Sequence, residues 1–522
     1  MQYFDFHTHI ILKQLFDENP NIDTKITPND VAFIPKECTD LPNIIKSQIH
    51  QSQLAELSDE VIIGATLYGC ESYLAAAVQD LQNFLNPASK HKMSIDKLKA
   101  IAADGYPTFN AFTKAMTFDA FMQALASFNI LTKQSFTNPL PKNKVNIFFL
   151  IEGCHSLVNT INKIDATHRY DTAEILANLD VLLQSAKVIG VNITHLQQSS
   201  LCNQAFAMQI ADPTHFIPLE DGFTDDGRTV VQGLFNRGIC VDFKHMSYKS
   251  RLDFISDVTQ GKYTNVQPPL CSHVGFTGIP FSKYAGYIMR TRSVSDAVYV
   301  ELVKPLQNDN TFFDPGIPAF NLSTINLFDE EIVWVVKQKG IIGLSLDRRI
   351  LGFENKFDDH PTGQDPTNEL YVDKEFISNR EWLSLGLNKV KIGGLIDADN
   401  SVTQDTEDVF DSVSARNDYF SDHVLLHLKH FFQVCFNNGI AIADAQKCIT
   451  IGSDYDGFIN SFLNIETVED IPALKQYIHI NLKNYLNSGE NSKVWASQLD
   501  IDNFIEDLFY NNGFNFIRSR FV

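Results

Sequence analysis

The chain has 522 residues, of which 44% are hydrophobic and 20% charged, and this composition allows a sizeable core and argues against wholesale disorder. A formal net charge of −21 argues against nucleic acid and anionic membranes as partners, because both need a basic surface. The opening MQYFDFHTHI lacks the features of a secretory signal, and no apolar run approaches the ~20 residues of a membrane helix. The eight cysteines form no CxxC pair, so we expect a cytoplasmic protein with reduced thiols.

Eight short apolar segments are predicted to be strands covered on both faces, because they are rich in Ile, Val and Phe with little polar alternation. They are residues 3–7, 61–67, 146–151, 187–193, 238–243, 269–272, 340–346 and 447–452. Helical periodicity occurs between them, at residues 72–85, 172–185, 229–236, 330–339 and 424–437. Asp225 or Asp226 is expected to cap the third of these helices. This alternation predicts a (β/α)₈ barrel or a doubly wound open sheet, and periodicity alone does not choose between them.

Three long stretches interrupt this alternation and are predicted to be insertions in a single catalytic domain. They span about residues 17–58, 285–323 and 351–422, and the last has no strong core pattern. In a barrel, inserted loops usually decorate the catalytic face and shape access to it. Residues from about 460 to 522 are predicted to form C-terminal helices, with the clearest patterns at 471–486 and 501–513.

Side chains that bind metals or transfer protons follow most of the predicted strands. They are His7, His9, Glu152, His195, His245, His273 and Asp454. The C-terminal ends of barrel strands converge on one mouth, where active sites lie. Five of the 15 histidines occupy these places, so the pattern indicates one shared site.

The residue types at these strand ends suit a pair of divalent ions, and their chemistry favours zinc. His7 and His9 point to the same side of their strand, because side chains alternate with period two. Imidazole and carboxylate are suitable zinc ligands, and a single Glu152 can join a His7/His9 site to a His245/His273 site. Two ions roughly 3.5–4 Å apart would share a hydroxide and polarise a scissile carbonyl.

The two remaining residues have roles in proton transfer and charge stabilisation. Asp454 would accept the proton from that hydroxide and pass it to the leaving amine. His195 would stabilise the oxyanion or orient the substrate, or would simply form a hydrogen bond within the barrel.

Other polar residues allow structural explanations as well as functional ones. His155 is either a supporting residue behind the ligands or a loop histidine. His423, His427 and His430 share one helical face, but without the Glu of an HExxH motif an amphipathic helix explains them better. The acidic residues between 397 and 411 do not have EF-hand spacing and are expected to form a solvated loop.

Seven segments of the chain resemble the membrane (renal) dipeptidase family, peptidase family M19, of the amidohydrolase superfamily. They are FDFHTHI, FLIEGCHSL, GVNITHLQQSSLCN, DDGRTVVQGLFNRGICVDFKHMS, PPLCSHVGFTG, INLFDEEIVWVVKQKGIIGLSLD and ITIGSDYDGF. They occur in family order and cover about a fifth of the chain. The resemblance implies a (β/α)₈ barrel of the metal-dependent hydrolase type, a small-molecule or dipeptide substrate, and a possible homodimer.

The resemblance also implies a role for each candidate residue. It makes His7, His9 and Glu152 ligands of one ion, and Glu152, His245 and His273 ligands of the other. It places His195 at the substrate carbonyl and gives Asp454 the acid–base role.

Two departures from the family pattern concern the first motif and substrate recognition. The family usually has Asp where this chain has His9, a change that keeps a ligand. The family's R-N-x-x-D motif, whose arginine binds the substrate carboxylate, is here Ile325-Asn326-Leu327-Phe328-Asp329. We consider Arg348 and Arg349 as replacements, and Arg290 or Arg292 in the second insertion as others.

These patterns favour a binuclear metal-dependent hydrolase that cleaves amide bonds in dipeptides or dipeptide-like compounds. One alternative keeps the site and changes the bond, giving a deacylase, a lactonase or a phosphoester hydrolase. Another is a non-catalytic barrel whose insertions bind a partner, but the complete ligand set argues against it.

Overall fold

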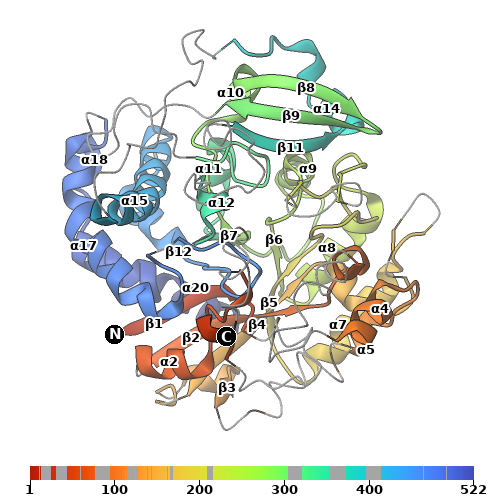
Figure 1. Ribbon diagram of the computed structural model, residues 1–522, viewed down its shortest axis with the longest axis horizontal. Helices are drawn as coiled ribbons and strands as arrows, with labels where there is room; N and C mark the ends of the chain where they lie inside the picture. Colours follow the sequence, from red (N-terminus) through yellow and green to blue (C-terminus); the bar gives the residue numbers. More distant parts are fainter. Residues whose placement is uncertain are drawn as a thin grey trace.

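The computed structural model has at its centre a barrel of eight parallel strands (Figure 1). In order around the barrel they are β1 (Gln2–Thr8), β2 (Glu60–Tyr68), β4 (Val145–Glu152), β5 (Val188–Asn192), β6 (Cys240–Asp242), β7 (Leu270–Val274), β10 (Ile341–Leu344) and β12 (Ile449–Ile451). The structure describes the chain except residues 11, 13–24, 31–43, 59, 77–93, 112, 114–123, 125–126, 138, 143, 162, 165–167, 208–215, 304–319, 353–371, 395–412, 463, 490 and 522. All eight predicted strands are confirmed.

The first and last strands close the barrel beside the candidate site. Thr8 and Tyr455 form a parallel bridge, and the backbone N of His9 donates to the carbonyl of Tyr455 at 2.8 Å. The backbone N of Asp454 donates to the carbonyl of His7 at 3.0 Å. Closure resolves the choice left by periodicity in favour of a (β/α)₈ barrel.

Alternate side chains of the strands enter two separate hydrophobic clusters. In β4, Phe148 and Leu150 join a cluster with other strand residues, whereas Phe149 and Ile151 pack toward the surrounding helices. The first cluster fills the barrel and is closed at its N-terminal end by the last helix, α20 (Asn512–Phe521). A Cβ on Gly513 would lie 2.1 Å from the ring of Phe4, so only glycine allows this close approach.

Helices surround the barrel, as the periodicity predicts. They include α7 (Thr172–Leu183), α8 (Asp225–Asn236), α9 (Tyr248–Thr259), α11 (Asp329–Lys337), α15 (Val413–Asn437), α17 (Ile471–Ser488) and α19 (Ile501–Glu506). The N-cap of α8 is Thr224, whose side chain accepts from the backbone N of Gly227. The prediction of an Asp225 or Asp226 cap is therefore wrong, because both lie in the first turn. Residues 77–85 of the first predicted helix lie outside the described residues.

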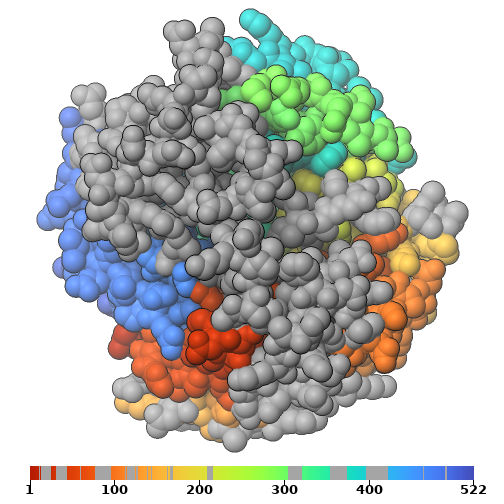
Figure 2. Space-filling view, in the orientation of Figure 1, coloured from red at the N-terminus to blue at the C-terminus, as the bar shows by residue number. Residues whose placement is uncertain are grey.

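Two of the insertions meet in a three-stranded antiparallel sheet, which we call the accessory sheet. Its strands are β8 (Ile288–Val294) and β9 (Ala297–Val303) from one insertion and β11 (Val372–Ser378) from the other. β11 leads into the short helix α14 (Asn379–Ser384). In Figure 2 the green and cyan segments of this sheet lie together at the surface. The expectation that residues 351–422 lack a core pattern is therefore wrong for β11 and α14.

The structure describes the remaining insertion only in part. Of residues 17–58, the described ones include α2 (Gln51–Leu57), and the acidic segment 397–411 lies outside the described residues.

Within the described chain, no helix is both long and apolar enough to cross a bilayer. Seven cysteines are buried and form no disulfide among themselves, and Cys38 is not described.

Candidate metal centre

Glu152 lies at the centre of the cluster formed by the predicted ligands. Its Oε2 is 3.1 Å from Nε2 of His9, and its Oε1 is 3.1 Å from Nε2 of His245. The Nε2 atoms of His7 and His273 each lie 3.5 Å from the same Oε1. Glu152 reaches this position because it ends β4 and continues the inward series of Phe148 and Leu150 at period two. The structure thus brings all five predicted ligands together.

The histidines form two pairs whose ring nitrogens face each other. Nε2 of His7 is 3.2 Å from Nε2 of His9, and Nε2 of His245 is 3.2 Å from Nε2 of His273. A neutral imidazole offers one lone pair, so each pair presents two donors to the same space beside a carboxylate. This donor set fits divalent ions of the zinc type.

Asp454 lies beside the first pair. Its Oδ1 is 3.4 Å from Nε2 of His9 and 3.9 Å from Nε2 of His7, and its Oδ2 is 3.9 Å from Nε2 of His273. Asp454 and His245 both have positive φ, of 64° and 69°. Such a backbone is strained for a residue with a Cβ, and it is common where a side chain must be aimed at a functional site.

Three sets of residues bring their donor atoms close enough to hold an ion. They are His7, His9 and Glu152; Glu152, His195 and His245; and His7, His273 and Asp454. The first set is one of the two predicted sets; the other predicted set, Glu152 with His245 and His273, is not among these three groups of described residues. The other two add His195, for which oxyanion stabilisation is expected, and Asp454, for which proton transfer is expected.

Burial and the carboxylates set the protonation of the cluster. Burial lowers the pKa of His245 to about 3, and it lowers the pKa values of His7 and His273 as well. Burial opposes the charged form of His9, but Glu152 and Asp454 raise the pKa of His9 to about 10. Three histidines are therefore neutral, as ligation requires, and a metal bound at His9 would displace a proton.

Glu71 is a buried residue of the site that the sequence analysis missed. It lies in the loop after β2, and its Oε1 is 2.5 Å from Nδ1 of His195. Tyr68 donates its hydroxyl to the other oxygen of Glu71, and the backbone N of Leu196 donates to Oε1 at 3.3 Å. Nε2 of His195 faces Glu152 Oε2 at 3.6 Å. The sequence does carry a signal for Glu71, because an acidic residue follows soon after the predicted strand at residues 61–67.

Two other polar residues support the site from behind. His155 is buried, with Nε2 2.5 Å from the carbonyl of Gly69 and 3.8 Å from Glu71. Asp5 accepts from the backbone N of Ser453 at 2.9 Å and of His7 at 3.3 Å. Asp5 therefore joins the two chain segments that carry His7 and Asp454.

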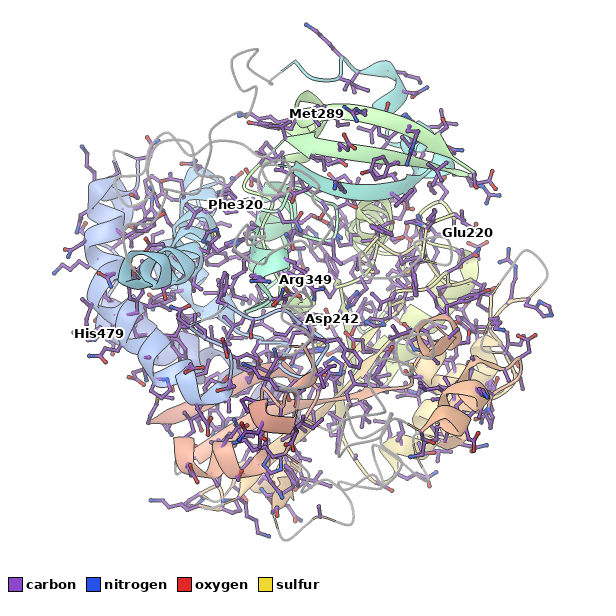
Figure 3. All side chains as sticks on the ribbon, viewed as in Figure 1. Glu220, Asp242, Met289, Phe320, Arg349 and His479 are labelled. Atoms are coloured by element: carbon purple, nitrogen blue, oxygen red, sulfur yellow. The ribbon has the colours of Figure 1, made fainter. Side chains whose placement is uncertain are left out.

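The candidate arginines differ in position. Arg349 pairs with Asp347, at 2.6 Å between NH2 and Oδ2, and lies near the centre of Figure 3. Arg348 is buried in the same short helix, α12 (Arg348–Leu351). Arg290 and Arg292 lie on exposed positions of β8, in the accessory sheet.

Two histidines on α15 connect the helix to the loop after β7 and to the ends of α12 and α11. His427 accepts from the backbone N of Phe276 at 3.2 Å, and its Nε2 lies 2.9 Å from the carbonyl of Leu351. His430 pairs with Asp329 at 2.9 Å. These contacts agree with the amphipathic-helix interpretation rather than with a metal site.

Solved structures were found to be similar along nearly the whole chain. One is a metallopeptidase from Rhodobacter sphaeroides liganded with a phosphinate mimic of the dipeptide L-Ala-D-Ala, at 13% identity, with 100% of this chain and 99% of that one covered and a TM-score of 0.48. A dipeptidase described as an M19 metallopeptidase has 12% identity, coverage of 100% and 99%, and a TM-score of 0.47. The probable dipeptidase PvdM from Pseudomonas aeruginosa has 11% identity, coverage of 100% and 96%, and a TM-score of 0.47. No family model and no curated protein matches the sequence.

Proposed function

We propose that the chain is a metal-dependent hydrolase that cleaves amide bonds, with dipeptides or dipeptide-like compounds as substrates and two zinc ions as cofactors. The observation that carries the proposal is the position of Glu152, within 3.5 Å of four histidine Nε2 atoms at the mouth of the barrel. One carboxylate with two imidazoles on each side offers the donor atoms that two metal ions need, which an ordinary structural salt bridge does not require. The motif resemblance to the M19 family supports the choice of substrate.

The residues of the centre have distinct roles in this proposal. His7, His9 and Glu152 would hold one ion, and Glu152, His245 and His273 would hold the other. When bound, such ions supply Lewis acidity, which polarises the scissile carbonyl.

The remaining two residues handle the proton and the developing charge. Asp454 accepts a proton from the attacking water and delivers it to the leaving amine. His195, held by Glu71, donates from Nε2 to the oxygen of the scissile carbonyl as negative charge develops there. Its pKa favours this role: burial opposes the charged form, yet Glu71 and Glu152 raise the pKa of His195 above its ordinary value.

The first test is an assay of the zinc-reconstituted protein with L,L and L,D dipeptides. We expect cleavage by the wild type, loss of cleavage in Glu152→Gln, and full activity in Glu506→Gln, a matched change on the exposed surface. Retained activity in Glu152→Gln would contradict the proposed mechanism. Two bound ions without dipeptide cleavage would contradict the substrate class alone.

Arg348 and Arg349 remain our candidates for binding the substrate carboxylate. Arg349 is paired with Asp347, whereas Arg348 is buried in the same short helix after β10. We expect Arg348→Ala and Arg349→Ala to raise KM for free dipeptides more than for dipeptide amides, because only the former carry the carboxylate. Unchanged turnover of free dipeptides in both variants would remove these arginines from the proposal.

A further inference from the structure

The Ser272 hydroxyl lies between two histidines from different strands. Its Oγ is 2.9 Å from Nδ1 of His7, on β1, and 2.9 Å from Nδ1 of His273, on β7. Ser272 is fully buried. A single hydroxyl therefore contacts one member of the His7–His9 pair and one member of the His245–His273 pair.

The protons at these contacts follow from the chemistry of imidazole. A neutral ring carries one proton, so a histidine that offers the Nε2 lone pair must carry its proton on Nδ1. His7 and His273 both turn Nε2 toward Glu152. Both Nδ1–H groups then donate to Ser272, whose oxygen has two lone pairs and can accept both. The hydroxyl proton of Ser272 must point to a third group.

A buried carboxyl that can accept this proton, that of Asp242, lies beside Ser272. Asp242 ends β6, next to β7, and its Oδ1 accepts from the backbone N of Ser272 at 3.1 Å. Its Oδ2 is buried, and no residue in the described part of the chain forms a hydrogen bond with it. Burial raises the pKa of Asp242 to about 7, and the nearby Ser272 hydroxyl opposes this rise by favouring the carboxylate. Figure 3 places Asp242 among the barrel strands near the centre of the view.

We propose that Ser272 sets the ring tautomer of one histidine in each half of the metal centre, with Asp242 receiving the hydroxyl proton. The inference rests on the proposed function, because it assigns those tautomers to metal binding. Residues that orient ligands from behind tune metal affinity almost as strongly as the ligands themselves. One hydroxyl contacts a histidine in each half of the metal centre. Its removal must therefore weaken the binding of both ions, whereas the loss of a residue that contacts a single ligand weakens the binding of only one ion.

The test is a zinc titration of the metal-free protein by calorimetry. We expect Ser272→Ala to weaken the binding of each ion by about 10- to 100-fold. The matched control is Ser345→Ala, a buried serine after the adjacent strand whose hydroxyl accepts from the backbone N of Asp347 rather than from a histidine. It should bind both ions as the wild type does. Weakening of only one ion, or of neither, would overturn the inference while leaving the proposed function intact.

A second measurement needs neither metal nor activity. The ¹⁵N chemical shifts of His7 and His273 in the metal-free protein should report protonated Nδ1 in both rings, and Ser272→Cys should change both while retaining the volume of the side chain. Protonation of either ring at Nε2 would overturn the inference. If the wild type binds no metal, the proposed function fails, and these shifts still decide whether Ser272 sets the tautomers.

Discussion

Oε1 of Glu71 lies 2.5 Å from Nδ1 of His195, and this contact joins two loops whose strands are not neighbours in the barrel. β4 separates the two strands and carries Glu152 at its end, so Nε2 of His195 is turned across β4 toward that carboxylate. Burial raises the pKa of Glu71, but His195 and His155 lower it to about 2. Glu71 is therefore a carboxylate throughout the neutral range, where it accepts from Nδ1–H of His195 and favours the doubly protonated ring, whose Nε2–H is free to donate.

Replacing Glu71 by Gln should separate binding from catalysis. The amide keeps the shape but loses the charge that stabilises protonated His195, so we expect kcat to fall about 10- to 100-fold while KM changes little. Steady-state kinetics with a dipeptide substrate would measure both constants, with Glu174→Gln on α7 as the matched control. If the fall in kcat were accompanied by a fall in Tm, Glu71 would instead have a structural role.

Metal removal should lower both activity and stability. Without ions, the facing histidine pairs and Glu152 remain buried together with no metal ion between them. An ion that binds only the folded state adds about 2.7 kcal/mol of stability at a concentration 100 times its Kd. We expect a chelator to lower Tm and abolish cleavage, and zinc to restore both. The absence of any zinc-dependent change in Tm would argue against a metal centre.

Metal binding should also release a proton near neutral pH. The pKa of His9 is raised to about 10 by Glu152 and Asp454, against the effect of burial, so His9 carries a proton that a metal ligand cannot keep. Titration with zinc in two buffers of different ionisation enthalpy would measure the number of protons released. His9→Asn should release fewer protons than the wild type. Equal heats in both buffers for the wild type would contradict the predicted protonation.

Activity should fall on the acid side with the titration of Asp454. Burial raises the pKa of Asp454 to about 6, and its catalytic form is the carboxylate that prevails above that value. We therefore expect kcat/KM to fall about tenfold per pH unit below pH 6. Asp454→Asn should be nearly inactive at every pH. A profile that stays flat down to pH 4.5 would remove Asp454 from the acid–base role.

Two buried carboxyls should make the accessory sheet sensitive to pH. Glu375 accepts from the backbone N of Thr324 at 2.9 Å, Glu381 accepts from Ser247 at 2.5 Å, and burial raises the pKa of each to about 7. Because the folded pKa lies above the ordinary value, their contribution to stability is full below about pH 4.5 and is lost as the pH rises through 7. The loss is on the order of 3 kcal/mol for each carboxyl at most, at 1.36 kcal/mol per pKa unit.

Hydrogen exchange of β8 and β9 at pH 5 and pH 8 would measure this effect. We expect faster exchange at pH 8 in the wild type and a smaller difference in Glu381→Gln, which stays neutral at both values. Arg380, on the same helix, pairs with Glu220 on the exposed side, so Arg380→Gln is a control that leaves the buried carboxyl in place. Exchange that does not depend on pH beyond the intrinsic rate would contradict the prediction.

The sequence predicts the barrel well because a parallel strand covered on both faces is a short apolar run. It also predicts the centre, since His7, Glu152 and Asp454 follow such runs directly. It does not predict the accessory sheet, because five of the seven residues of β8 are exposed and its sheet is completed by β11, far along the chain. Glu71 and Ser272 escape prediction for a similar reason: their roles arise from contacts between loops and strands that are distant in sequence.

The accessory sheet links two segments that the chain adds after different barrel strands. β9 lies in the middle and pairs with β8 on one side and β11 on the other. Deleting residues 372–378 would leave an edge of β9 with unpaired backbone groups, a surface that invites pairing with another chain. The two additions are therefore interdependent, and a shortened form of the protein that stays monodisperse must lack both or retain both.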